Sequence, residues 1–173
     1  MRKVKYYVAC SVDGFIAHED GTWDGFLMDG EPVTDYLASF KRFDAVLMGR
    51  HTYEVGVRAG TTNPYPTMES YVFSRTMQER PDERVTLVSD NAGAVVRQLK
   101  QEDGQDIYLC GGASLATALL EEGLIDEIIL KVNPFLMGAG IPLFAGVIRQ
   151  TALALIKSTV YENGCVWLYY RVK

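Results

Sequence analysis

Histidine and cysteine are both scarce in this chain, which has two histidines and three cysteines. The histidines lie far apart, and no two cysteines have the close spacing of a zinc site, so we expect no bound metal. Cys10, Cys110 and Cys165 each lie in or beside an apolar, strand-like run, where a thiol usually behaves as a small core residue. An odd number of such cysteines indicates a reduced protein without structural disulfides, as is typical of the cytoplasm.

The chain also lacks an excess of positive charge and any long apolar run. Its 17 basic and 22 acidic residues give a net charge of −5, which argues against a nucleic-acid or membrane-surface partner. No apolar run approaches the roughly 20 residues that a membrane span needs. The first five residues lead directly into an apolar strand without the pattern of a secretory signal. We therefore expect a cytoplasmic protein that binds neither nucleic acid nor membranes.

Size and composition indicate one folded domain. The chain has 173 residues, of which 48% are hydrophobic and 23% charged, and this is ordinary for a globular protein with a full core. We see no internal repeat, low-complexity tract or linker. A single domain is therefore expected over residues 1–173.

Short apolar runs alternate with amphipathic segments along most of the chain. The predicted strands are residues 3–10, 45–48, 70–73, 85–88, 107–109, 127–132, 152–161 and 165–172, and the predicted helices are 33–43, 50–57, 91–101 and 113–122. Asn163-Gly164 is a strong hairpin signal between the last two strands. This order predicts an α/β fold: one mostly parallel, twisted sheet flanked by helices, with an antiparallel hairpin at the C-terminus.

Two strand-to-helix turns, about 60 residues apart, carry the strongest functional signal. One is Met48-Gly49-Arg50 and the other is Cys110-Gly111-Gly112, and each joins a short apolar strand to a polar or small residue that opens a helix. Unpaired backbone N–H groups and the helix dipole favour anions at such a turn. Two of them indicate a site for both ends of a pyrophosphate, although twin glycines can also serve close strand–helix packing.

These motifs, taken in order, resemble the dihydrofolate reductase superfamily, and within it the reductase domain of riboflavin biosynthesis, the RibD C-terminal domain. The resemblance rests on five segments that cover nearly the whole chain. They are Ser11 to Ala17, Met48 to Glu54, Gly111 to Leu115, Leu124 to Glu127, and Pro134 with Gly138, Gly140 and Leu143-Phe144.

The resemblance implies NADPH as the hydride donor and a small, flat nitrogen heterocycle as the substrate. It implies the following cofactor contacts: Gly49, Arg50 and Thr52 at the phosphates, Ser74 and Arg75 at the adenosine 2′-phosphate, and Gly111, Gly112, Ser114 and Leu115 at the pyrophosphate and ribose. Guanidinium groups suit phosphate, and glycines let the backbone approach an anion closely.

Candidates at the substrate are fewer. Ser11 and Trp23 are expected to contact the substrate, and Asp13 and Asp35 are the candidate proton donors, with ordered water as an equal alternative. Asp13 could instead be an ordinary turn residue, and Asp35 a helix-surface carboxylate. Cys110 stands where riboflavin-type reductases commonly have Glu before the twin glycines.

Three functions stay open at this point. The first is a reductase of the RibD C-terminal type, acting in riboflavin biosynthesis on a ribosylaminopyrimidine. The second is a dihydrofolate reductase, and the third is a sensor that binds NADPH without catalysis.

We also expect a homodimer, because the apolar hairpin at residues 152–172 would be an aggregation hazard if it were left open to water.

Overall fold

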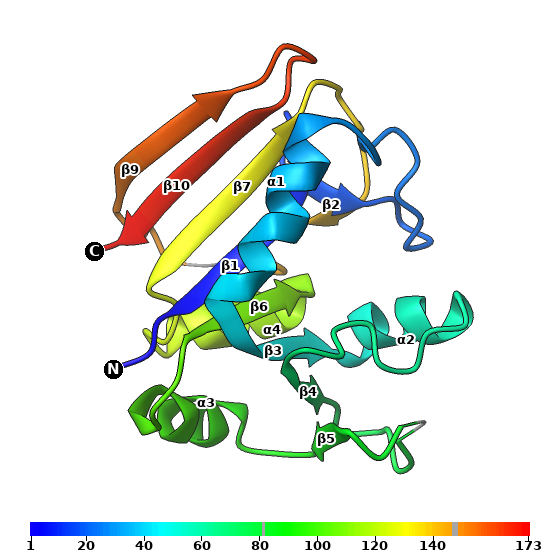
Figure 1. Ribbon diagram of the computed structural model, residues 1–173, viewed down its shortest axis with the longest axis vertical. Coiled ribbons are helices and arrows are strands. Elements are labelled where there is room, and N and C mark those ends of the chain that lie inside the picture. The colour runs from blue at the N-terminus through cyan, green and yellow to red at the C-terminus, as the bar shows by residue number, and fades with distance from the viewer. Residues whose placement is uncertain (81, 147–148) are drawn as a thin grey trace.

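The centre of the molecule is a twisted eight-stranded sheet in the computed structural model, which describes residues 1–80, 82–146 and 149–173 (Figure 1). Its strands are β1 (Val4–Ser11), β3 (Phe43–Gly49), β4 (Glu69–Phe73), β5 (Val85–Val88), β6 (Asp106–Gly111), β7 (Glu127–Asn133), β9 (Leu153–Val160) and β10 (Val166–Val172), while β2 (Phe15–Ala17) and β8 (Ile141–Pro142) form a separate small sheet. The helices are α1 (Glu31–Ser39), α2 (Arg50–Arg58), α3 (Ala92–Gln101) and α4 (Ala113–Glu121), with a 3₁₀ turn, η1 (Phe40–Arg42), after α1.

The strand order is β5-β4-β3-β6-β1-β7-β10-β9. Each neighbouring pair from β5 to β7 is parallel, and β10 runs antiparallel to both β7 and β9. The prediction of a mostly parallel sheet that ends in an antiparallel hairpin is therefore confirmed. The tight turn between β9 and β10 allows these two strands to pair only in the antiparallel direction.

Helices cover both faces of the sheet, as the continuous apolar strands require. One core cluster joins α3 and α4 to the sheet, with Val96 and Leu119 completely enclosed. The opposite cluster includes Tyr36 of α1 and Tyr53 of α2. In Figure 1, α1 crosses in front of β1 and β7, while α4 lies behind β6.

The first helix differs from the prediction in its length and in the face that it buries. It spans residues 31–39, not 33–43, because Pro32 is accommodated in its first turn and Phe43 already belongs to β3. Tyr36 and Phe40 pack edge-to-face with 4.7 Å between ring centroids, whereas Leu37 is exposed. The helical spacing of the apolar residues at positions 33, 36, 37, 40 and 43 predicts that all five share one buried face. This pattern indicated the helix correctly but assigned Leu37 to the wrong side.

The long polar segment after β1 contains one element that was not predicted. Residues 15–17 form β2, which pairs antiparallel with β8 in a small second sheet. Strands of two or three residues carry too little alternation to be recognised from the sequence.

The C-terminal hairpin turns at Asn163-Gly164, as predicted. Gly164 adopts φ +84°, and the amide of Tyr161 donates to the carbonyl of Cys165 at 2.9 Å. β10 is enclosed between β7 and β9, so β9 is the edge strand.

None of the helices in the described part of the chain has the length and apolar content that a membrane span requires.

Buried ion pairs fasten the amino-terminal ends of the strands. Lys100 is buried on α3, and its Nζ donates to Asp126 Oδ2 at 2.7 Å. The same carboxylate oxygen accepts the backbone amide of Val4 at 2.8 Å, so a single group joins α3, β1 and the segment before β7.

We predict that Asp126→Ala lowers the free energy of unfolding by about 2–3 kcal/mol, because it leaves the Lys100 ammonium and the Val4 amide without their acceptor. Urea unfolding measures the loss. Arg97→Ala is the control, since its pair with Glu122 is exposed and should contribute less than about 1 kcal/mol. Equal losses in the two variants would contradict the prediction.

Candidate functional site

A large cavity of about 1130 Å³ opens where the parallel strands end. Its walls include Gly49 after β3, Ser74 after β4, Ser89 after β5 and Gly112 after β6. Ligands of open α/β sheets bind in this position, outside the carboxyl ends of the strands. The volume exceeds the range of about 300–1,000 Å³ that is usual for one small ligand, so a dinucleotide and a small ring can share it.

The two glycine turns meet at this cavity. Gly49 precedes α2 and Gly112 precedes α4, and neither helix start has a side-chain cap. A Cβ atom built on Gly49 would lie 3.3 Å from the backbone nitrogen of Gly112, and one on Gly112 would lie 3.2 Å from Thr52 Oγ1. The peptide bond between Gly111 and Gly112 is cis. Two uncapped helix N-termini thus open side by side, an arrangement that suits an anion with two phosphates.

Two arginines lie at the same walls. Arg50 pairs with Glu54 across 3.7 Å, and its Nη2 lies 2.9 Å from His51 Nε2. Arg75 is exposed and follows β4. Ser74 Oγ accepts the amides of Thr76 at 3.2 Å and Met77 at 2.9 Å, so this hydroxyl fixes the turn that carries Arg75.

The other end of the cavity is aromatic. The hydroxyl groups of Tyr36 and Tyr108 lie 2.7 Å apart, and the Tyr65 hydroxyl lies 3.3 Å from Cys110 Sγ. Burial raises the pKa of each of these three tyrosines and of the Cys110 thiol. These groups are therefore neutral hydrogen-bonding groups at pH 7, and Cys110 is not a ready nucleophile.

Lys131 lies in the same aromatic end and was missed from the sequence. It is only 9% exposed, and its Nζ lies 4.0 Å from the centroid of the Tyr36 ring. Burial lowers its pKa. The available signal was a charged residue inside the apolar run of β7, because buried strands rarely carry an unpaired lysine.

Most of the predicted site residues line the cavity. They are Trp23, Gly49, Arg50, Thr52, Ser74, Arg75, Gly112, Ser114 and Leu115. Four predicted residues are not among the described lining residues: Ser11, Asp13, Asp35 and Gly111.

Asp13 and Ser11 form part of a turn anchor beside the cavity. Ser11 Oγ donates to Asp13 Oδ1 at 2.6 Å, and the amides of Met137 and Gly138 donate to the same carboxylate at 3.0 and 2.7 Å. These hydrogen bonds lower the pKa of Asp13 to about 2. The carboxylate is thus ionised at pH 7 and holds residues 137–138 against the end of β1.

Asp35 faces the hairpin. Its Oδ2 accepts the hydroxyl of Tyr161 at 2.8 Å, which ties α1 to the turn between β9 and β10. The catalytic roles expected for Asp13 and Asp35 remain predictions, and the positions of the two carboxylates give them no support.

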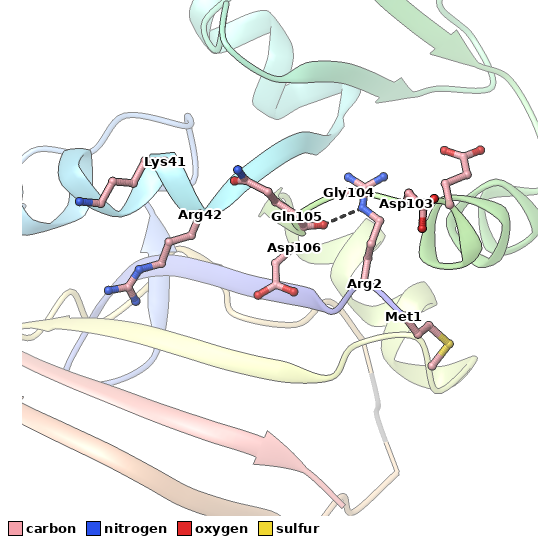
Figure 2. A pocket seen from close by; sticks show the side chains of 9 residues that line it. Met1, Arg2, Lys41, Arg42, Asp103, Gly104, Gln105 and Asp106 are labelled. Carbon is pink, nitrogen blue, oxygen red and sulfur yellow. Dashed lines mark hydrogen bonds between the residues drawn. The ribbon is translucent and has the colours of Figure 1, made fainter.

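A second, smaller hollow of about 390 Å³ lies at the opposite, amino-terminal edge of the sheet (Figure 2). Arg2 occupies its wall and donates from Nε to the carbonyl of Gln105 at 2.7 Å, while its other nitrogens reach Asp44 and the Leu99 carbonyl. Lys41 and Arg42 extend from η1 on the side away from Arg2. Because Arg2 is already paired within the chain, this hollow is part of the framework. Residues 1–80, 82–146 and 149–173 hold no group of three or more His, Cys, Asp and Glu side chains that could bind a metal.

We predict that Asp13→Ala lowers the urea midpoint of unfolding, and that this deficit shrinks in acid. The folded pKa of about 2 lies below the usual value of 3.8, so the stabilisation is present above about pH 4 and is lost as the pH falls towards 2. Midpoints measured from pH 6 to pH 3 for both proteins test this. A deficit that stays constant across that range would contradict the anchoring role.

Comparison with known proteins identifies one protein family along nearly the whole chain. The sequence profile of the RibD C-terminal domain matches residues 2–167. The uncharacterized protein YwjB of Bacillus subtilis is 38% identical over 170 residues, with 98% of this chain and 97% of YwjB covered. A crystal structure of a putative riboflavin biosynthesis protein from Shewanella sp. PV-4 superposes with a TM-score of 0.85 at 29% identity, covering 100% of this chain and 99% of that one. The riboflavin biosynthesis protein RibD of Corynebacterium ammoniagenes is 26% identical over 83% of this chain and 46% of its own length. The chain belongs to the RibD C-terminal domain family.

Proposed function

We propose that this protein is an NADPH-dependent reductase of a small, flat nitrogen heterocycle, of the kind that reduces a ribosylaminopyrimidine in riboflavin biosynthesis. One observation carries the proposal. Two uncapped helix N-termini open side by side into a cavity that also has an aromatic end. Membership of the RibD C-terminal domain family and the similarity to a riboflavin biosynthesis protein, RibD, support the same reaction class.

The cofactor would lie along the carboxyl ends of β3, β4 and β6. Gly49 and Gly112 would present their turns to the pyrophosphate, with Thr52, Ser114 and Leu115 beside them. Arg75, held by the Ser74 turn, would meet the adenosine 2′-phosphate. NADPH supplies the hydride when it is bound.

The chain itself would orient the ring and keep water away from it. Tyr36 and Tyr108 offer a flat aromatic wall with paired hydroxyls, and Trp23 lies at the exposed rim of the same cavity. Ionised Asp13 fits the role of a positioning residue better than that of a proton donor, and ordered water is the simpler source of the proton.

The two alternative functions have less support. A dihydrofolate reductase would need a carboxylate from the first helix at the ring, and here Asp35 is hydrogen-bonded to Tyr161 outside the cavity lining. A sensor without catalysis would bind NADPH equally well and differs only in turnover.

The reduced state of Cys10, Cys110 and Cys165, all free thiols, is consistent with a cytoplasmic location.

We predict that NADPH binds at least about tenfold more tightly than NADH, because a charged hydrogen bond to the 2′-phosphate contributes about 1–3 kcal/mol. Arg75→Ala should remove most of this preference and change NADH affinity little. Fluorescence titration at one ionic strength measures both constants, with Arg97→Ala as the control for loss of a surface arginine. Equal affinities of the unmodified protein for the two cofactors would remove the assigned 2′-phosphate site.

Turnover separates reductase from sensor. NADPH oxidation is followed at 340 nm with a ribosylaminouracil phosphate, dihydrofolate and a simple pterin as trial substrates. Oxidation with the ribosylaminopyrimidine supports the riboflavin-type activity. Tight NADPH binding without oxidation of any substrate would favour the sensor.

A homodimer is also part of the proposal. The edge strand β9 exposes large apolar side chains, among them Leu155 at 58% and Val160 at 75%. Such an edge invites pairing with another chain, and a two-fold dimer is the commonest closed arrangement.

We predict a particle of about twice 19.3 kDa in light scattering at micromolar concentration. Leu155→Lys should shift it towards the monomer, because the ammonium would be buried without a partner. Leu37→Lys is the matched control, since Leu37 is similarly exposed on α1. A monomeric unmodified protein would rule out the dimer.

A further inference from the structure

Lys131 stands apart from the other buried cations of this protein. Among the described residues, three cationic side chains are buried: Arg2, Lys100 and Lys131. Arg2 pairs with Asp44 and Lys100 pairs with Asp126. Lys131 has no carboxylate within ion-pair distance in the described part of the chain. An unpaired buried charge is expensive, so its retention indicates a partner that comes from outside the chain.

The surroundings of Lys131 form a contiguous bay in the cavity, which we call the lysine bay. It consists of Tyr7, Tyr36, Tyr108, Cys110 and Lys131, all of which line the cavity. The Tyr36 ring lies 5.1 Å from the Tyr7 ring and hydrogen-bonds through its hydroxyl to Tyr108. The bay therefore combines flat apolar walls with neutral hydroxyls and one cation.

The secondary structure explains why the ammonium group reaches this bay. Lys131 lies near the carboxyl end of β7, directly opposite Ala9 of β1 and Trp167 of β10. The small side chain of Ala9 leaves room on that face, and the Tyr36 ring from α1 covers the lysine with its electron-rich face. This cation–π contact offsets part of the desolvation of the ammonium but provides no counter-charge.

The carboxylates of the cavity wall do not complete the pair. The acidic residues among the described lining residues are Glu19, Asp20 and Asp90, all exposed, and none lies within 4.0 Å of Lys131. The Cys165 thiol, which also acts on the Lys131 ammonium, is protonated because burial raises its pKa. The positive charge is thus available to a ligand.

We propose that Lys131 binds an acidic oxygen carried directly on the ring of the substrate, so that the lysine bay selects anionic flat rings over neutral ones. This inference rests on the proposed function, because it takes the lysine bay as the substrate half of the cavity. A ring edge made only of N–H donors would meet the ammonium unfavourably, whereas a ring carboxylate or enolate oxygen would form the missing ion pair. The neighbouring hydroxyls of Tyr36 and Tyr108 can donate to the same oxygen.

Matched ligand pairs test the charge preference directly. The probes are orotate against uracil, pterin-6-carboxylate against 6-methylpterin, and uridine 5′-phosphate against uridine, each titrated by calorimetry with and without NADP⁺. We expect at least one of the two ring acids to bind about tenfold more tightly than its neutral partner. Lys131→Met should abolish this preference and Lys131→Arg should retain most of it.

The melting temperature of the Lys131 variant separates a ligand-binding role from a structural role. Lys131→Met keeps an unbranched side chain of nearly the same length and removes an unpaired buried charge, so its melting temperature should equal or exceed that of the unmodified protein. Lys100→Met is the matched control and should lower the melting temperature, because it leaves Asp126 without its cation. A loss of stability in Lys131→Met as large as in Lys100→Met would assign Lys131 to the framework and overturn the proposal.

The remaining outcomes are equally decisive. The proposal is overturned if neither ring acid is preferred, or if the preference survives in Lys131→Met. A preference confined to the uridine pair would place the anion on a side arm and overturn a ring-borne oxygen. NADPH affinity is measured separately in all variants, so a failure of cofactor binding would remove the proposed function without deciding the charge preference.

Discussion

The direct pairing of β3 with β6 is the constraint on which the rest of this structure depends. Met48 pairs with Gly111 in the parallel ladder, which brings the ends of two strands from distant parts of the sequence to one point. Glycine suits this contact, because a Cβ atom on Gly49 would come within 3.3 Å of the Gly112 nitrogen, which is tighter than most side chains allow. The close approach brings two helix N-termini to one wall of the cavity, where we propose that the phosphates bind.

Charge is distributed unequally between the two ends of the sheet. At the amino-terminal ends, Arg2 and Lys100 are buried with carboxylate partners and hold the strands and α3 together. At the carboxyl ends, Lys131 is buried over an aromatic ring without such a partner among the described residues. A paired buried cation contributes to the framework, whereas an unpaired one is a liability that a ligand of opposite charge removes. This difference distinguishes the smaller hollow, which Arg2 lines, from the large cavity in which we propose that the ligands bind.

Sequence patterns predicted an element most accurately where residues close along the chain are enough to form that element. Alternating apolar runs, the glycine turns and Asn163-Gly164 each indicated their elements because backbone propensity acts within a few residues. The glycine turns also predicted residues that line the cavity, among them Gly49 and Gly112. Short elements such as β2 and β8, and the outward orientation of Leu37, could not be predicted, since they depend on pairing with segments that lie far along the chain.

The sequence by itself therefore determined the α/β fold, the strand–turn–helix units and the positions of Gly49 and Gly112. Tertiary structure alone decided what the polar side chains do. It directs Asp13 to the amides of Met137 and Gly138, and it turns Asp35 towards Tyr161. It also leaves Lys131 without a carboxylate in the described part of the chain. The physical reason is that a hydrogen bond or an ion pair needs atoms within about 3–4 Å, and only the folded chain sets those distances.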